Sequence, residues 1–154
     1  ASGSWNGARD GEALVVGARL IGRIEHDGAL TSDARLLGDP GFAVNALARL
    51  DDRDAPVVLG RLVSRGRARG DAAADEVDFK WNAVVPIAAA DGASSVHALL
   101  FTGSGDGGVP RGLLLGECEL PLVGGTHMLR VRQGVDTRDV RHVYVRELNP
   151  EARP

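Results

Sequence analysis

Short segments in which apolar and polar residues alternate run through this sequence, and glycine and proline separate them. An alternation with a period of two residues is typical of a β-strand that buries one face. In one such segment, Phe79, Trp81, Ala83 and Val85 place apolar side chains on the same face. No long stretch keeps the period of a helix, so the sequence predicts an all-β sandwich or barrel.

Eight strands are predicted, over residues 12–21, 42–50, 57–64, 77–86, 95–102, 113–120, 127–132 and 140–147. Two sheets built from them would bury a core between layers about 10 Å apart. Trp81 is predicted to anchor that core because its ring buries a large area. A chain of 154 residues fits one domain, over residues 11–148, with a flexible segment at 1–10 and a tail at 149–154.

The composition excludes several classes of protein. The formal net charge of −3 argues against a general nucleic-acid binder. No apolar run approaches the roughly 18 residues of a membrane-spanning helix, and no signal peptide is visible. The lone Cys118 excludes an internal disulfide and is predicted to be a small buried residue. We therefore expect a cytoplasmic protein, attached to the periphery of a membrane if it binds lipid.

No pattern in the sequence indicates catalysis. The four histidines, His26, His97, His127 and His142, lack the spacing of metal ligands, and His97 is predicted to be packed or hydrogen-bonded. The glycine-rich run 103–108 lies between predicted strands, whereas a phosphate-binding loop needs a helix directly after it. We predict that the protein is not an enzyme, that it has no small-molecule substrate, and that calcium is the one cofactor to consider.

Four motifs follow one another along the chain: "DARLLGDPGFAV", "DFKWNAVVPI", "VHALLFTGSGDGG" and "LLLGECELPL". Their order and spacing resemble those of C2 domains, the calcium- and phospholipid-binding β-sandwiches. The resemblance extends over about residues 12–148 and includes the Asp39-Pro40 turn, the Trp81-Asn82 strand and the Leu115-Gly116-Glu117 strand. It implies an eight-stranded antiparallel β-sandwich that docks to a membrane or to another protein.

The resemblance also implies where calcium would bind. In calcium-binding C2 domains, aspartates from two loops supply ligands, and Ca²⁺ takes six to eight oxygen atoms. This chain keeps Asp33 and Asp39 in the first loop and Asp106 in the third, but Thr102 and Ser104 occupy two carboxylate positions. Three carboxylates could bind one ion weakly. We favour instead a turn-capping role for Asp39 and solvated roles for the other two, and therefore calcium-independent docking.

Basic residues are predicted to gather on the third and fourth strands and on the connection between them. The candidates for lipid binding are Arg61, Arg65, Arg67, Arg69 and Lys80. In C2 domains this face can meet anionic headgroups, and clustered basic residues contribute about 1 kcal/mol each at an anionic membrane. The acidic residues of segment 71–78 offer the alternative that they neutralise this face.

We predict a non-catalytic docking module within a larger intracellular protein. It would bind an anionic phospholipid surface or a protein partner, without calcium and without nucleic acid. Three apolar loop residues would either insert into a membrane or anchor their loops inside the protein: Leu36, Leu37 and Val109. Two alternatives stay open: a protein–protein scaffold or assembly domain with no lipid binding, and an unrelated exported β-sandwich of a secretion system or a viral assembly.

Overall fold

The computed structural model describes residues 2–3, 11–26, 32–68, 75–84, 86–88, 92–105, 109–134 and 144–146. Within these residues the chain forms strands joined by turns, and none of them lies in a helix. The all-β prediction is therefore confirmed. The strands are β1 (Ser2–Gly3), β2 (Ala13–Val16), β3 (Arg19–His26), β4 (Ser32–Leu36), β5 (Ala43–Leu50), β6 (Val57–Arg67), β7 (Glu76–Ala83), β8 (Ser95–Thr102), β9 (Leu114–Pro121), β10 (Gly125–Arg132) and β11 (Tyr144–Arg146).

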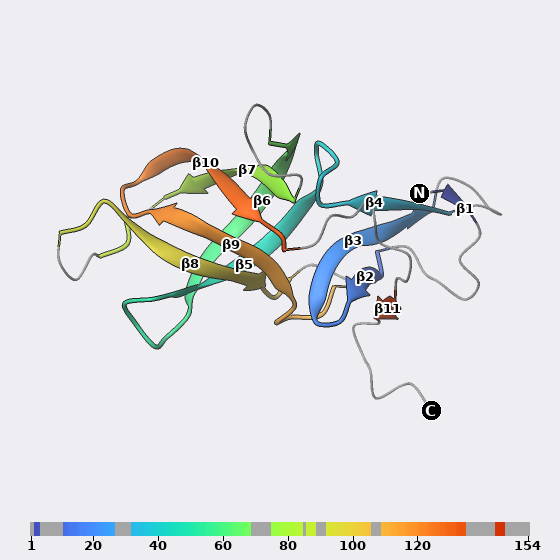
Figure 1. Cartoon of the computed structure of the whole chain (residues 1–154), viewed down its shortest axis with the longest axis horizontal. Helices are drawn as coiled ribbons and strands as arrows, with labels where there is room; N and C mark the ends of the chain where they lie inside the picture. Colours follow the sequence, from blue (N-terminus) through green and yellow to red (C-terminus); the bar gives the residue numbers. More distant parts are fainter. Residues whose placement is uncertain are drawn as a thin grey trace.

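Six strands close into a barrel, in the order β5, β6, β7, β10, β9, β8 and back to β5 (Figure 1). Each of them is antiparallel to both of its neighbours in the ring. Most junctions are ladders of several residue pairs, whereas β9 and β10 meet at the single pair Glu117 and Arg132. The barrel is therefore a curled sheet that closes at one seam, and two separate sheets are not evident in it.

Strands β2, β3 and β4 form an antiparallel extension beside the barrel, on the right of Figure 1. β1 pairs with β4, and β11 pairs with β2. One parallel contact, between Arg19 of β3 and Leu114 of β9, joins the backbone of the extension to the barrel. Apolar side chains of the extension, such as Leu20, also belong to the main core cluster. The extension thus packs on the barrel without being part of the ring.

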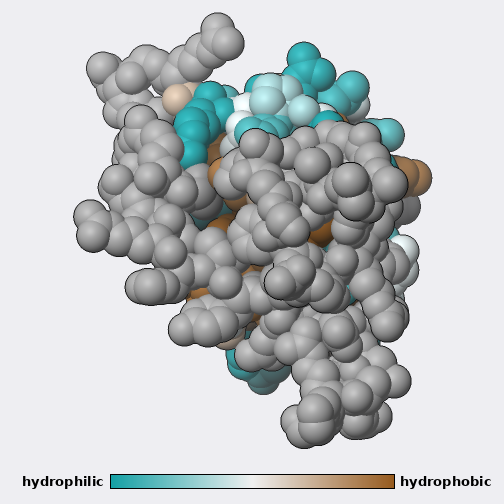
Figure 2. All heavy atoms as spheres, turned by 90° about the vertical axis from the view of Figure 1, so that its right-hand side faces the viewer, coloured by the Kyte–Doolittle hydropathy of each residue, from teal (hydrophilic) through white to brown (hydrophobic). Residues whose placement is uncertain are grey.

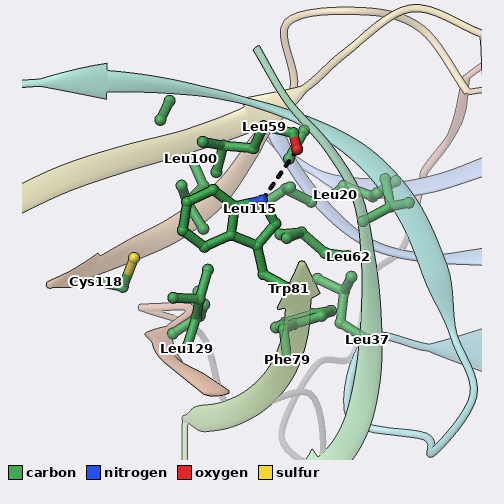
Figure 3. Close-up of a cluster of buried hydrophobic side chains, with 14 of the residues drawn as sticks. Leu20, Leu37, Leu59, Leu62, Phe79, Trp81, Leu100, Leu115, Cys118 and Leu129 are labelled. Carbon is green, nitrogen blue, oxygen red and sulfur yellow. Dashed lines mark hydrogen bonds between the residues drawn. The ribbon is translucent and has the colours of Figure 1, made fainter. Parts of the chain in front are cut away.

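Alternation along the strands places apolar side chains inside the barrel. In β7, Phe79 and Trp81 are buried, whereas Lys80 between them is exposed. The Trp81 indole Nε1–H donates a hydrogen bond of 3.0 Å to the Leu59 carbonyl oxygen (Figure 3). The predictions that Trp81 anchors the core and that Cys118 is buried are both confirmed. Deleting a buried aromatic ring of this kind typically costs about 3–5 kcal/mol.

The N-terminal part of the chain differs from its prediction. The single strand predicted over residues 12–21 is a hairpin: β2 ends at Val16, and β3 begins at Arg19. Gly17 makes this turn possible, because its φ of 61° is a conformation that residues with a side chain rarely adopt. The predicted loop over residues 33–39 begins with most of β4. The other predicted strands agree with β5 to β11, with shifts of a few residues at their ends.

Candidate anion-binding surface

Arg61 and Arg65 lie on the outer face of the barrel, in β6. Leu62 and Ser64 point inward and are buried, so the alternation of the strand turns both arginines outward. Val63, between the arginines, pairs with Lys80 of β7. Lys80 is therefore the diagonal neighbour of Arg61, and Arg65 lies one step further along β6, at the irregularity of the ladder between Ser64 and Gly66. These three exposed cations, Arg61, Arg65 and Lys80, form one patch that we call the basic face.

The nearest acidic residues are engaged by β10 rather than by the basic face. The Arg130 Nε–H donates to Asp78 Oδ1 at 3.2 Å. Arg130 and Arg132 also approach the carboxylate of Glu76, each at 3.9 Å. In the part of the chain that the structure describes, none of the ion pairs involves the basic face. Three acidic residues of segment 71–78 are described. Glu76 and Asp78 interact with the arginines of β10, and the Asp75 carboxylate accepts a 3.1 Å hydrogen bond from the Gly134 N–H.

The other two predicted basic residues do not extend this patch. Arg67 is half-buried, and its Cγ lies 3.3 Å from where a Cβ on Gly38 would be, so it packs against the turn after β4. Arg69 lies outside the described residues.

Figure 2 views the molecule from the side of the extension. Hydrophilic side chains gather at its top, at the height where Figure 1 draws the end of β6.

A hollow of about 190 Å³ lies where the extension meets β5 and β6, and we call it the arginine hollow. Arg23 and Glu25 of β3, Arg35 of β4 and Arg61 of β6 supply its charged side chains. Three of these four were not predicted as candidates, because the predicted strand ends at residue 21. The signal that could have found them is the continued alternation of Arg23, Ile24 and Glu25, in which only Ile24 is buried.

Three of the four charged groups in the arginine hollow are held by neighbours. The Arg23 guanidinium lies over the Phe42 ring, with 4.8 Å between the Cζ and the ring centroid, and it donates a hydrogen bond to the Ala43 carbonyl oxygen. The Arg35 Nε lies 3.1 Å from each carboxylate oxygen of Glu25. A cation over an aromatic face and a guanidinium–carboxylate pair both restrict where the side chain can lie. The hollow therefore contains oriented guanidinium groups.

The candidate calcium ligands do not form a cup in the described residues. The backbone of Asp33 lies in β4, where it pairs with Glu25 and with Ser2, and not in a loop. Asp39 Oδ2 accepts a 2.7 Å hydrogen bond from the Leu36 N–H, as the predicted turn-capping role requires. Asp106 lies outside the described residues. Among the residues described, no group of three or more His, Cys, Asp or Glu side chains could hold a metal ion.

The hydroxyl group of Thr102 ties together the ends of the third loop. The Thr102 hydroxyl donates to the Pro110 carbonyl oxygen at 2.6 Å and accepts from the Leu113 N–H at 2.9 Å. Val109 in this loop and Leu37 after β4 are 2 % and 0 % exposed, so both anchor their loops in the protein. They are therefore not membrane-inserting tips in this structure.

His97 is hydrogen-bonded, as predicted from its place in a strand. Its Nδ1 lies 3.2 Å from Asp51 Oδ2, and its Nε2 lies 3.2 Å from Glu117 Oε2. The hydrogen bond with Asp51, followed by that with Glu117, raises the pKa of His97 above its usual value. Two carboxylates beside one imidazole favour the protonated ring. This arrangement links three parts of the barrel and resembles an ion-pair network more than a nucleophile with its base.

Comparison of the chain with models of known protein families finds no match, and comparison with curated proteins finds none. Within the described residues, no helix has the length and apolar character needed to cross a membrane.

Proposed function

We propose that this protein is a non-catalytic docking module whose basic face binds an anionic surface. The observation that carries the proposal is that Arg61, Arg65 and Lys80 lie together and exposed, outside every ion pair of the described residues. At about 1 kcal/mol for each basic residue near an anionic membrane, the face supplies about 3 kcal/mol. Docking of this strength is weak and reversible, so it suits one contact among several in a larger intracellular protein.

Calcium-independence is part of this proposal. It is supported by Asp39, whose carboxylate already caps the turn after β4. It is also supported by Thr102, whose hydroxyl is used by the backbone of the third loop. A cytoplasmic location, the relation to C2 domains and the two-layer sandwich remain predictions from the sequence. The docking proposal does not require them.

A protein partner is the second candidate, and exposed valines favour it. Val58, Val84 and Val123 are 76 %, 87 % and 57 % exposed. β6 and β7 are antiparallel, and β10 begins opposite the end of β7, so these residues lie at one end of the barrel. Exposed apolar residues that gather in one place are a common feature of protein interaction sites. In this case the protein would act as a scaffold or assembly domain.

Binding to vesicles tests the docking proposal. The protein is sedimented with phosphatidylcholine vesicles that contain increasing fractions of phosphatidylserine or phosphoinositide. We expect binding that rises with the anionic fraction, falls with salt and does not change with millimolar Ca²⁺. The double variant Arg61→Glu, Arg65→Glu should bind at least about 30-fold more weakly, because two contributions of about 1 kcal/mol are lost and two negative charges are added.

The matched control is the double variant Arg49→Glu, Arg111→Glu, which changes the net charge by the same amount. Arg49 and Arg111 are exposed but lie outside the basic face, in β5 and in the turn before β9. We expect it to retain most of the binding. Equal loss in the two double variants would mean that only total charge matters, and absence of vesicle binding by the native protein would rule out the lipid function.

A further inference from the structure

The large apolar side chains that are exposed among the described residues gather on one side of the barrel. They are Val58, Val84, Val123 and Met128, and each is more than half exposed. Val58 lies in β6, Val84 directly follows β7, Val123 lies in the loop that leads to β10, and Met128 lies in β10. These three strands are consecutive in the ring. We call their outward-facing side chains, together with Val84 and Val123, the outer wall.

The exposed apolar side chains adjoin the basic face. Met128 pairs directly with Lys80, so an apolar side chain and a cation are cross-strand neighbours on the outer wall. Val84 lies four residues after Lys80 and continues the outward alternation of β7. Val58 and Arg61 are both exposed on β6. The outer wall therefore combines exposed aliphatic groups with exposed cations, whereas exposed apolar residues of most proteins are scattered singly.

Val123 and Val84 belong to segments that touch. A Cβ on Gly124 would lie 3.6 Å from the Ala83 carbonyl oxygen, so the loop between β9 and β10 lies against the end of β7. The His127 Nε2 lies 2.8 Å from the Val123 carbonyl oxygen and holds the loop to β10. Two exposed valines thus share one end of the outer wall.

The groups along the outer wall follow the order of the layers at a membrane surface. At about 3.3 Å per residue, Lys80 lies about 13 Å from Val84 along the chain. Between them, Asn82 and its partner Thr126 are exposed and uncharged. The headgroup layer of one leaflet is roughly 5–8 Å thick. A wall tilted against the membrane can therefore place Val84 at the acyl boundary while Lys80 stays among the phosphate groups.

Aspartates at the same end of the barrel limit how the protein can approach a membrane. Asp51, Asp52 and Asp54 lie in the loop between β5 and β6. The Asp51 carboxylate lies 3.2 Å from His97, and this loop also bonds β8 through its backbone. Asp52 is paired with Arg53. An anionic bilayer repels carboxylates, so we expect β5 and β8 to be turned away from it.

We propose that the outer wall inserts shallowly into an anionic phospholipid bilayer. Val84 and Val123 enter the acyl boundary, and Arg61 and Lys80 contact the phosphate groups. This inference rests on the proposed docking function, and it adds the orientation of the barrel and an apolar contribution to binding. Salt screens the contact of basic residues with headgroups, whereas apolar side chains in the interface add affinity through their buried area.

The test attaches an environment-sensitive fluorophore to a single introduced cysteine, in Val84→Cys or in the matched control Ser95→Cys. Ser95 is exposed at the same end of the barrel but lies in β8, across the ring from β7. The native protein, treated in the same way, measures any labelling of Cys118. With vesicles of equal parts phosphatidylcholine and phosphatidylserine, we expect a blue shift and quenching by brominated acyl chains at position 84, and neither at position 95.

Sedimentation with the same vesicles gives a second measurement. The double variant Val84→Thr, Val123→Thr keeps the charge and nearly keeps the shape of the side chains, and both positions are exposed. It should bind vesicles about tenfold more weakly, because two apolar groups are lost from the interface. Circular dichroism checks that the variant is folded.

Vesicle binding with no response at position 84, or with an equal response at position 95, would overturn insertion of the outer wall and leave the docking proposal standing. Unchanged vesicle binding by the threonine variant would do the same, and the valines would then be assigned to a protein partner. Absence of vesicle binding by the native protein would overturn docking and insertion together.

Discussion

His97 couples the charge of one residue to the stability of the barrel. It lies in β8 between Asp51 of the loop after β5 and Glu117 of β9, and Glu119 is its direct partner across the β8–β9 ladder. Its pKa is raised in the folded state, chiefly by the hydrogen bond with Asp51. The stabilisation from this pairing is therefore complete below the unfolded pKa of about 6.5 and is lost as the pH rises through the folded pKa.

We expect the His97 contribution to the free energy of unfolding to be lost as the pH rises above the unfolded pKa of about 6.5 and through the raised folded pKa, and the variant His97→Gln to lack this loss. The pairs are partly exposed, so the difference should be below about 1 kcal/mol. Urea unfolding of both proteins at several pH values measures it. Other titrating groups are common to the two proteins and cancel in the comparison. Parallel stability curves would show that His97 makes no such contribution.

The sequence predicts whether a side chain points into the core or outward, but it does not predict which side chains meet across neighbouring strands. Trp81, Arg61 and Arg65 could be predicted because strand alternation alone decides whether each side chain points in or out. The position of Arg23 opposite Arg35 could not be predicted from the sequence, because it depends on the pairing of β3 with β4 and on their packing beside β5. Alternation gives the direction of a side chain within a strand, but it does not identify the neighbouring strand.

At the scale of elements, Gly116 is the residue that allows β9 to approach β10. A Cβ on Gly116 would lie 2.4 Å from the Arg132 carbonyl oxygen and 2.7 Å from Val131 Cγ1. Its φ of 150° is also rarely adopted by residues with a side chain. The only β9–β10 pair, Glu117 with Arg132, lies directly beside it. The motif Leu115-Gly116-Glu117, which resembles a motif of C2 domains, thus has a structural role at the seam between β9 and β10.

We predict that Gly116→Ala lowers the free energy of unfolding by about 1–3 kcal/mol or more, because the methyl group must displace backbone. Gly60→Ala is the control. Gly60 also has a positive φ, of 84°, but nothing lies within 4 Å of the added Cβ, so it reports the conformational strain alone. Urea denaturation of the two variants measures the difference. Equal losses would contradict a role for close packing at the seam.

The strands themselves were predictable where turns and alternation agree, as in β5 and β8. The β2–β3 hairpin was missed because the apolar residues on both sides of Gly17 read as one continuous strand. β4 was missed because its sequence, SDARL, is mostly polar and alternates weakly. The closing of the ring was beyond prediction, since it joins strands through contacts that no local pattern contains.

At the scale of the whole molecule, Cys118 reports on the opening of the barrel. It is the only cysteine of the chain, and it is 5 % exposed in β9. Burial, with smaller contributions from the charges of Glu119 and Glu117, raises the pKa of its thiol to about 12. Only the thiolate is nucleophilic, so the folded protein should react very slowly with thiol reagents. A reagent therefore gains access only when the barrel opens.

We predict that the labelling rate of Cys118 rises with urea in parallel with unfolding, and that Gly116→Ala accelerates labelling in the absence of urea. Reaction with a chromogenic disulfide at about pH 8 measures both rates. The native protein at high urea provides the rate of the fully accessible thiol. Rapid labelling of the folded protein, independent of urea, would mean that β9 does not bury this side chain.

The seam between β9 and β10 also bears on aggregation. A closed ring has no edge strands, but a ring that is held at one junction by a single residue pair can open into a sheet with two edges. Unpaired N–H and C=O groups along those edges would accept a strand from a second molecule, as in domain swapping. We therefore expect substitution of Gly116, which lets β9 and β10 meet, to increase self-association as well as to lower the free energy of unfolding.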